Sequence, residues 1–493
     1  MELKIKNLKW SAGIPVAMLN KETAEKIGVH ANDRISIRTI SKNSREISAI
    51  VDIVEKLVKK DEIAISLEIK HNLKLKVRQK VDVNFMSPPK SMKSIKKKID
   101  GKNLNRKEMY SIINDLMNDS LSESELALFI LGMYRQKTTM KETIYLIEAI
   151  SDSGSRFKLK NKFVVDKHSI GGISGNRTTP LVVSICAAAG LIIPKSSSRA
   201  ITSAAGTPDV MEVLTPVEFS IQEVKKIVQK TRGCIVWGGA TGMVPADAKL
   251  IKIEKQLEID PPSQMIASIM AKKLATGADY ILIDIPYGKT AKVDKKSAIE
   301  LKKKFEYLGK HFKKKLRAVL TDGEQPIGNA VGPVLEMIDL LKILNPEKRG
   351  PRDLEEKALF LAGEILEMTG KAKKGKGKEM ARGVLLSGKA FSKFKEIISA
   401  QGGKLREFKS AKFSKDIHAK KSGKILEIHN KKINALARIA GSPMDKSAGL
   451  YIYHHVREKV KKGDKLLTIY SESKSRLNES VRFYNNEKPI VIM

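Results

Sequence analysis

The stretches KHSIGGISGNR (residues 167–177) and SSSRAITSAAGT (residues 196–207) are the most informative part of this chain. Glycines in the first stretch let backbone N–H groups come close to a ligand, and the lysine, arginine and hydroxyl side chains of both are donors that suit phosphate. Each stretch alone is compatible with an ordinary strand-to-helix turn. The two together, separated by the apolar segment 181–194, predict an oxyanion site that binds phosphate or a phosphorylated molecule.

Strand and helix patterns alternate around these stretches, from residue 163 to about residue 409. Strands are expected at Phe163-Val-Val-Asp, 234–237 and 280–285, and helices at 181–190 and 263–277. This alternation predicts a mainly parallel sheet with ligands at the carboxyl ends of its strands. The first glycine stretch directly follows such a strand, and so does Gly288-Lys289.

The whole chain is predicted to contain four regions, because 493 residues exceed a single compact core. Residues 1–86 have short β-like runs and a helix closed by Gly28, which predicts a small β-barrel module. Residues 87–160 have a helical apolar period and predict a helical domain, which part of 220–265 could join. Residues 161–409 form the α/β phosphate- and nucleotide-binding domain, and residues 410–493 a C-terminal α+β module.

The formal net charge of +37 would attract any polyanion, so nucleic-acid binding has to be weighed. The excess lysines occur in runs without interleaved aromatic residues, which make up only 5% of the chain, so few side chains could stack on bases. We interpret the charge as a basic surface, adapted to salt or to heat, with nonspecific nucleic-acid contact at most.

Cys186 and Cys234 have apolar neighbours and are expected in the core. No signal-peptide core or long apolar run occurs, so a cytoplasmic location without membrane contact is expected.

The helix predicted at 263–277 follows Asp260-Pro-Pro, with Ser263 as a possible cap. Ser268 and Lys272 lie four residues apart and therefore on one face, where such a pair is usually only solvated. Asp260 could simply cap the helix, or could be shielded enough to hold a proton and donate it. The eight histidines show no metal-ligand spacing, so neither a metal nor a cofactor is expected.

The two phosphate-like stretches resemble the signature region of the thymidine/pyrimidine nucleoside phosphorylase family. The sequence SRAITSAAGT is similar to that of the archaeal branch of this family, the AMP phosphorylases. The order of segments fits that branch over nearly the whole chain. The resemblance implies a type II nucleoside phosphorylase-like fold: α/β with a helical domain, a small β-rich N-terminal module and an α+β C-terminal module. It implies the following site residues: Lys167, Ser169, Ser197 and Thr207 for phosphate; Gly172, Ser198, Arg199, Ala200, Ile201, Thr202, Ser203, Thr207, Ser268 and Lys292 for the nucleotide; and Lys272 for the base.

Two departures from the pyrimidine-specific members affect the expected substrate. Their base-anchoring arginine aligns with Ile253, so the usual contact to a pyrimidine carbonyl is missing. Lys292 matches a nucleotide-contacting lysine of the archaeal branch and suits a 5′-phosphate, although it could also be a solvated surface lysine. In that branch the aspartate matching Asp260 is the proposed proton donor to the leaving base. His168 could orient the sugar or base, or be structural.

The resemblance therefore implies an AMP phosphorylase-like enzyme, a pentosyltransferase. It is expected to convert AMP, with CMP and UMP as further substrates, and phosphate to free base and ribose 1,5-bisphosphate. Inorganic phosphate is a co-substrate and no cofactor is needed. The first alternative is a pyrimidine nucleoside (thymidine) phosphorylase, and the second a non-catalytic RNA-binding protein on this scaffold. A homodimer that assembles into larger homo-oligomers through residues 1–86 is implied by the resemblance.

Overall fold

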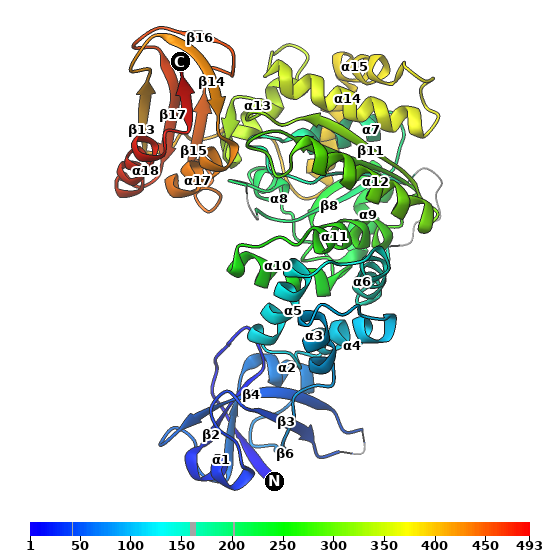
Figure 1. Cartoon of the computed structure of the whole chain (residues 1–493), viewed down its shortest axis with the longest axis vertical. Coiled ribbons are helices and arrows are strands. Elements are labelled where there is room, and N and C mark those ends of the chain that lie inside the picture. Colours follow the sequence, from blue (N-terminus) through cyan, green and yellow to red (C-terminus); the bar gives the residue numbers. More distant parts are fainter. Residues whose placement is uncertain (42, 158–163, 201–202) are drawn as a thin grey trace. The chain divides into compact units, whose positions relative to one another are not determined.

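A computed structural model describes residues 1–41, 43–157, 164–200 and 203–493 (Figure 1). The chain forms two compact units, each described here by itself. The first unit contains Met1–Gly154 and Val244–Ala271, and the second contains Ser155–Met243 and Lys272–Met493.

The first unit begins with a closed six-stranded barrel, coloured blue in Figure 1. Its strand order is β1-β5-β2-β4-β3-β6. Side chains alternate between the buried core and the surface, as in β2, which is the period-two pattern of a strand with one buried face. The predicted small barrel is confirmed. Its elements are β1 (Glu2–Lys6), β2 (Val16–Asn20), α1 (Lys21–Ile27), β3 (Arg34–Thr39), β4 (Glu46–Val54), β5 (Glu62–Ile65), α2 (Leu67–Leu73) and β6 (Lys80–Phe85).

A helical bundle completes the first unit. Helices α4, α5 and α6 each begin with a capping box, in which the cap side chain and a glutamate three residues later satisfy each other's backbone N–H groups. Arg34 of the barrel forms an ion pair with Glu125 of this bundle. The helices are α3 (Ser91–Ile99), α4 (Arg106–Met117), α5 (Glu123–Arg135), α6 (Met140–Asp152) and α10 (Pro245–Leu257), together with the first part of α11 (Pro262–Ala275).

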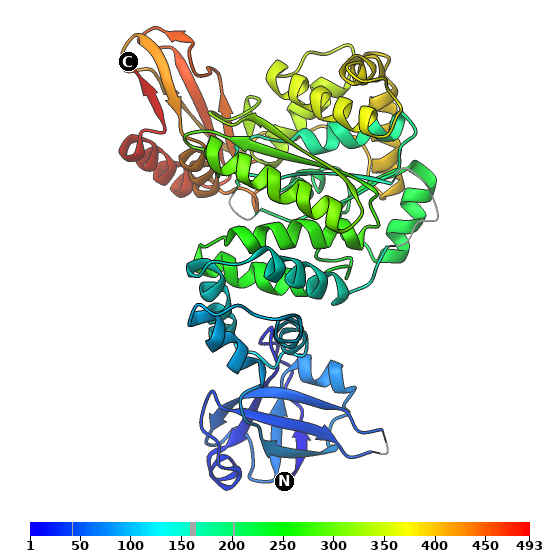
Figure 2. The same cartoon turned by 45° about the vertical axis from the view of Figure 1, so that its right-hand side comes forward.

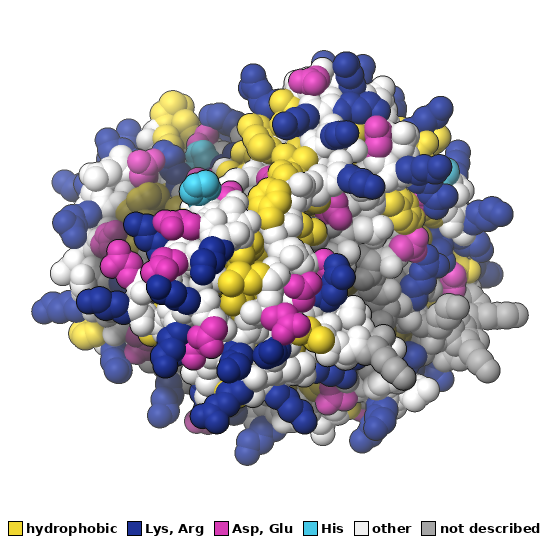
Figure 3. All heavy atoms as spheres, turned by 90° about the horizontal axis from the view of Figure 1, so that it is seen from below, with side chains coloured by type: hydrophobic (Ala, Val, Ile, Leu, Met, Phe, Trp, Pro, Cys, Tyr) yellow, Lys and Arg dark blue, Asp and Glu magenta, His cyan; other side chains and the backbone are white. Residues whose placement is uncertain are grey.

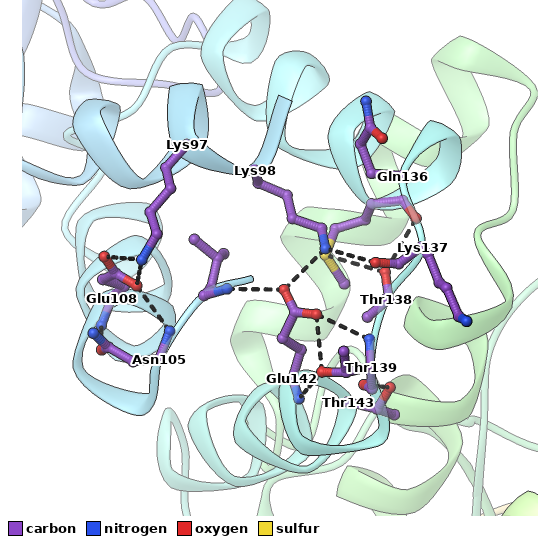
Figure 4. Close-up of polar contacts among 12 residues, drawn as sticks. Lys97, Lys98, Asn105, Glu108, Gln136, Lys137, Thr138, Thr139, Glu142 and Thr143 are labelled. Carbon is purple, nitrogen blue, oxygen red and sulfur yellow. Dashed lines mark hydrogen bonds and ion pairs between the residues drawn. The ribbon is translucent and has the colours of Figure 1, made fainter. Parts of the chain in front are cut away.

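A fully buried ion pair lies inside the bundle (Figure 4). Lys98 on α3 and Glu142 on α6 are 0% and 1% exposed, and Nζ lies 2.9 Å from the carboxylate. Glu142 also accepts hydrogen bonds from the backbone N–H groups of Leu104 and Thr139, while Lys98 donates to the carbonyl of Lys137. Burial alone would raise the pKa of Glu142, but these N–H donors and Lys98 hold it below its usual value. The pair is therefore balanced in charge and well supplied with hydrogen bonds.

The α/β part of the second unit contains two parallel sheets. Strand β10 lies between β11 and β7, strand β8 pairs with β9, and a parallel bridge from Val164 to Ile192 links the two sheets. Helix α12 packs on β10 and β11, and α14 packs on β10 and α7 (Figure 2). The strands are β7 (Val165–Ser169), β8 (Ile193–Ser197), β9 (Gly233–Trp237), β10 (Tyr280–Tyr287) and β11 (Lys315–Asp322). The helices are α7 (Thr178–Ala188), α8 (Thr207–Met211), α9 (Ile221–Thr231), α12 (Lys295–His311), α13 (Pro333–Leu344), α14 (Arg352–Met368), α15 (Gly377–Leu386) and α16 (Lys389–Ala400).

The C-terminal module, coloured orange to red in Figure 1, shares a sheet with the α/β part. Strand β12 (Ala330–Val331) pairs with β15 in the order β12-β15-β17-β13, and the order β16-β14-β18 makes a second sheet. Ala204 and Val331, outside the module, belong to its apolar core. The module contains β13 (Phe413–His418), β14 (Gly423–Ile428), α17 (Asn430–Ala440), β15 (Gly449–Ile452), β16 (Lys459–Val460), β17 (Lys465–Ser471), α18 (Lys474–Glu487) and β18 (Ile490–Ile492).

Two local predictions differ from the structure. Helix α11 begins at Pro262, so Ser263 lies inside its first turn, where its buried hydroxyl has no hydrogen-bond partner, and Ser263 as the cap is wrong. Proline, whose fixed φ fits the first helical position, starts the helix one residue earlier than expected. The strand expected from Phe163 begins at Val165, and Phe163 itself is outside the described residues. No helix in the described part of the chain has the length and apolar character of a membrane span.

Candidate active site

The two signature stretches leave the sheets at the carboxyl ends of neighbouring parallel strands. The first loop (residues 170–177) follows β7, and the second loop (residues 198–206) follows β8. In the register of the first sheet Ser169 pairs with Asp284, and in that of the second sheet Ser197 pairs with Trp237. The parallel bridge between Val164 and Ile192 brings the two strand ends to the same edge. The predicted position of the first loop at the carboxyl end of a parallel strand is thus confirmed, and β8, which was not predicted, places the second loop at the same edge.

Close packing makes glycine necessary in the first loop. Gly172 has a φ of +89°, and a Cβ atom there would lie 2.7 Å from Cβ of Lys292. Gly175 has a φ of +68°, and its Cβ would lie 2.3 Å from the carbonyl oxygen of Ile327. Only glycine tolerates both the positive φ and these contacts. Lys292, in the third loop (residues 288–293) after β10, therefore lies directly against the first loop.

Arg177 joins the first loop to the second. Its guanidinium donates to the hydroxyl of Thr207 at 3.1 Å and to the carbonyl of Ala205 at 2.6 Å, and it forms an ion pair with Glu336 at 2.6 Å. All three charged or hydroxyl side chains are buried. Because the guanidinium is planar and has five donors, it can orient several acceptors at once. Arg177 thus fixes Thr207, one of the predicted phosphate ligands.

Asp209 and Arg199 stabilise the second loop. The Asp209 carboxylate accepts hydrogen bonds from the N–H groups of Ala200, at 2.8 Å, and Gly206, at 2.7 Å. Arg199 forms ion pairs with Asp209, Glu212 and Glu218 and lies over the ring of Trp237. These carboxylates, Glu212 first, raise the pKa of Arg199. The structure therefore gives Arg199 a role in holding the loop, whereas the resemblance implied a nucleotide contact.

Six buried charged side chains, on or next to the strands that lead into the loops, form a connected group. Asp166 lies 2.6 Å from Nζ of Lys273 and 3.4 Å from Nζ of Lys195, and Asp284 lies 3.4 Å from Nζ of Lys357. All of these side chains are less than 10% exposed, and so is Lys167. This group of six residues, Asp166, Lys167, Lys195, Lys273, Asp284 and Lys357, is called the lysine cluster below. Four lysines with two aspartates leave an excess of positive charge that an anion would compensate.

Lys167 stands on β7, two residues before the strand ends and the first loop begins. It donates to the hydroxyl of Thr178, the first residue of α7, at 2.8 Å. Burial lowers the pKa of Lys167 to about 7, with Asp284 opposing the shift and Lys357 adding to it. Asp284 has the opposite balance: burial alone would raise its pKa, but Lys357 and Lys167 bring it below the usual value. An arriving phosphate would favour the charged form of Lys167.

His168 and Ser169 end strand β7. Burial, and then the charges of Lys273 and Lys195, hold the pKa of His168 well below its usual value. His168 is therefore a neutral imidazole near neutral pH, able to donate one hydrogen bond and accept another. Ser169 hydrogen-bonds Asp284 and accepts from the side-chain amide of Asn176 at 3.4 Å.

The other predicted residues fall into three groups. Ser197 and Ser198 are half-buried at the end of β8 and the start of the second loop, and Ser203 donates to the carbonyl of Ala205. Ile201 and Thr202 lie outside the described residues. Asp260, which is half-buried, Ser268 and the buried Ile253 belong to the first unit, whereas the loops and Lys272 belong to the second.

Sequence reasoning missed Thr178, Arg177, Lys195, Lys273, Asp284 and Lys357 as parts of this site. Thr178 and Arg177 stand within the quoted first stretch or next to it, so their position at a helix start was a usable signal. The strand-end position of Asp284 was a weaker one. Lys357 on α14 had no local signal. Within the described residues, no group of three or more His, Cys, Asp or Glu side chains is arranged to hold a metal ion.

Known families match this chain in three consecutive segments. Residues 92–154 match the "Glycosyl transferase family, helical bundle domain", residues 161–391 the "Glycosyl transferase family, a/b domain", and residues 424–490 the "Pyrimidine nucleoside phosphorylase C-terminal domain". The crystal structure of anthranilate phosphoribosyltransferase from Thermus thermophilus is similar in fold, with a TM-score of 0.52, 18% identity, and coverage of 63% of this chain and 99% of that one. Fold and site thus define a glycosyl transferase with a helical and an α/β domain.

Curated relatives cover the chain from end to end. It is 41% identical to the AMP phosphorylase of Methanococcoides burtonii and 42% identical to that of Pyrococcus furiosus, over 100% of this chain and 97% and 98% of those proteins. A putative thymidine phosphorylase of Legionella pneumophila strain Corby is 43% identical over 85% of this chain and 81% of that protein. The chain therefore belongs to the thymidine/pyrimidine nucleoside phosphorylase family, in the AMP phosphorylase branch, and is a pentosyltransferase. The predicted family and fold class are confirmed.

Proposed function

We propose that the enzyme catalyses the reversible phosphorolysis of AMP, and of CMP and UMP, to free base and ribose 1,5-bisphosphate. The observation that supports the phosphate part is the lysine cluster, in which Lys167 and Lys195 stand on β7 and β8, the strands that lead into the two loops. The name shared by the full-length relatives from Methanococcoides burtonii and Pyrococcus furiosus supports the nucleotide part.

In the proposed reaction an oxygen of inorganic phosphate forms a bond to C1′ of the ribose. The C1′–N bond breaks, its electron pair goes to the base, and Asp260 supplies the proton that makes the base a better leaving group. Lys167, Ser169, Ser197 and Thr207 would hold the phosphate, and neutral His168 would offer a hydrogen bond to the sugar or base. Phosphate is a co-substrate, and the scheme needs no cofactor.

Nucleotide contacts are proposed for the first and second loops, Ser268 and Lys292, and a base contact for Lys272. Lys292 would contact the 5′-phosphate. Its close packing on Gly172 supports this assignment, because it holds the start of the lysine side chain against the first loop. A dianion in reach of a lysine makes charge-assisted hydrogen bonds, which a free 5′-hydroxyl cannot make as strongly.

One assay tests the proposal. The protein is incubated with phosphate and, separately, AMP, CMP, UMP, adenosine, uridine and thymidine, and the released base and sugar phosphate are identified by chromatography and mass spectrometry. Release of adenine and ribose 1,5-bisphosphate from AMP is expected. Release from the nucleosides but not from the nucleotides would favour a thymidine phosphorylase instead, the activity that the name of the Legionella relative suggests.

The RNA-binding alternative rests on the charge of the chain. Lys and Arg side chains cover much of the face drawn in Figure 3, but Asp and Glu side chains lie among them. We therefore propose only nonspecific contact with nucleic acid. A cytoplasmic location is proposed as well. RNA binding without phosphorolysis of any substrate would contradict this proposal.

We also propose that the barrel, residues 1–86, assembles dimers into larger particles. Deleting it should leave a catalytic dimer with lower thermal stability, because subunit contacts stabilise by mass action. Light scattering measures the particle size, and an unchanged size would contradict this role for the barrel.

A further inference from the structure

The C-terminal module reaches the site through the first turn of α17. Asn430 and Asn434 stand at the start of this helix, four residues apart and therefore on one face. They are 0% and 4% exposed. Buried asparagines are costly unless their amide groups are hydrogen-bonded, so their partners show what the side chains do.

Asn430 is bonded to three separate segments of the α/β part. Its side-chain oxygen accepts from the N–H of Ser174 at 3.1 Å, and its backbone carbonyl accepts from the Ser174 hydroxyl at 2.9 Å. Its side-chain amide donates to the Thr290 hydroxyl at 3.0 Å and to the carbonyl of Gly323 at 3.1 Å. Ser174 belongs to the first loop, Thr290 to the third, and Gly323 follows β11.

Asn434 holds the second loop. Its side-chain oxygen accepts from the N–H of Ala204 at 3.0 Å. Ala204 is 1% exposed and belongs to the apolar core of the C-terminal module, so this part of the loop is anchored by packing as well as by the hydrogen bond. One helix turn therefore contacts all three loops that carry the proposed phosphate and nucleotide ligands.

We infer that Asn430 and Asn434 are positioning residues for the reaction, through which the C-terminal module sets the relative placement of the three substrate loops. The inference rests on the proposed function for its substrates. Neither side chain needs to touch substrate. Each side chain instead holds a backbone segment next to a residue that is proposed to contact the nucleotide. Ser174 follows Gly172 by two residues, Thr290 precedes Lys292 by two, and Ala204 follows Ser203 directly.

The first test compares two substitutions of Asn434 by kinetics at a temperature where every variant is folded. Asn434→Asp keeps the acceptor oxygen and should leave the KM values for AMP and phosphate within about twofold, whereas Asn434→Leu loses it and should raise them about tenfold, the size of one hydrogen bond. Asn485→Ala, an exposed asparagine of the same module, is the control and should change nothing. Equal KM values in all three variants, with only the melting temperature lowered in Asn434→Leu, would overturn the inference.

The second test removes the contact between Asn430 and the third loop from both ends. Asn430→Ala and Thr290→Val should each raise KM, and the double variant should be little worse than Asn430→Ala alone, because that substitution already removes the contact with Thr290. Additive effects would contradict a coupled role.

Calorimetric titration with inorganic phosphate separates this inference from the proposed function, since it requires no turnover. If the wild type binds phosphate but releases no base from AMP, the proposed function fails. Weaker phosphate binding by Asn434→Leu than by Asn434→Asp would still support positioning, and equal binding would contradict it.

Discussion

Both compact units bury lysine side chains completely, but they do so in opposite ways. In the helical bundle, one lysine, Lys98, faces one carboxylate, Glu142, and backbone groups satisfy what remains (Figure 4). In the α/β part the lysine cluster has four lysines and only two aspartates. Buried charges are costly unless they are compensated. The bundle compensates its charge within the chain, whereas the α/β part leaves an excess that suits an anionic substrate.

Both sites are buried, so burial does not distinguish the structural ion pair from the proposed binding site. Their balance of positive and negative charge does. Lys98 and Lys167 are both almost fully buried, at 0% and 1% exposure. In the lysine cluster, burial lowers the pKa of Lys167 to about 7, with the neighbouring lysines adding to the shift and Asp284 opposing it. The following predictions use this contrast, beginning with the largest expected effect.

Asp260→Asn should lower turnover with AMP by about 10²–10⁴-fold, the usual size of general acid catalysis. Asp260 shares its unit with the Lys98–Glu142 pair, yet thermal stability should change little, because asparagine keeps the size of the side chain and its ability to form hydrogen bonds. Steady-state kinetics and thermal unfolding measure the two effects. Near-normal turnover would show that Asp260 only caps the helix.

Lys98→Met should lower the free energy of unfolding by about 3–5 kcal/mol, because it leaves Glu142 buried without its cation. The kcat of the folded fraction should not change. Lys97→Met is the matched control: its pair with Glu108 is partly exposed, at 34% and 24%, so about 1 kcal/mol or less is expected. Denaturant unfolding of both variants makes the comparison.

Lys195→Met is the counterpart in the lysine cluster. Asp166 would keep Lys273 at 2.6 Å, so the loss of stability should be smaller than for Lys98→Met, while the KM for phosphate rises. A stability loss as large as that of Lys98→Met, with phosphate affinity intact, would mean that the cluster is structural as well.

Lys292→Ala should weaken the use of AMP far more than that of adenosine, since only AMP offers a 5′-phosphate. A lost charge-assisted contact costs about 1.5–3 kcal/mol, or roughly 10–150-fold in kcat/KM. Equal losses for both substrates would argue that Lys292 supports the first loop through its packing on Gly172 and does not contact the 5′-phosphate.

The last prediction concerns the pH dependence of phosphate use. A lysine is charged below its pKa, so with Lys167 at about 7 its charged fraction in the free enzyme falls about tenfold per pH unit at higher pH. The kcat/KM for phosphate should fall in the same range. Lys167→Arg stays charged, and the ratio of the two profiles cancels the ionisation of phosphate itself. A constant ratio from pH 6 to pH 9 would contradict this role of the Lys167 charge.

Local sequence predicted the elements that depend on near neighbours. The barrel strands, the helix ended by Gly28 and the strand before the first signature stretch follow from apolar period, glycine and proline positions. Strand β8, before the second stretch, was not predicted. The cap of α11 was wrong because Ser263 and Pro262 both suit a helix start and the fixed φ of proline decided between them. The three carboxylates that bind Arg199 cannot be recognised as its partners from the sequence alone, so its contribution to holding the second loop was not predicted.

The fold class, the two phosphate-like loops and the family could be predicted from the amino-acid sequence, because they depend on short motifs and on periodic patterns. Tertiary structure alone decided which distant residues compensate one another. Ser174 and Asn430 are 256 positions apart, and Lys167 and Lys357 come from different elements of the α/β part. Their energies depend on burial and on short distances, which no local pattern encodes. The balance of buried charge and the hydrogen bonds from α17 to the substrate loops therefore become apparent only in the folded structure.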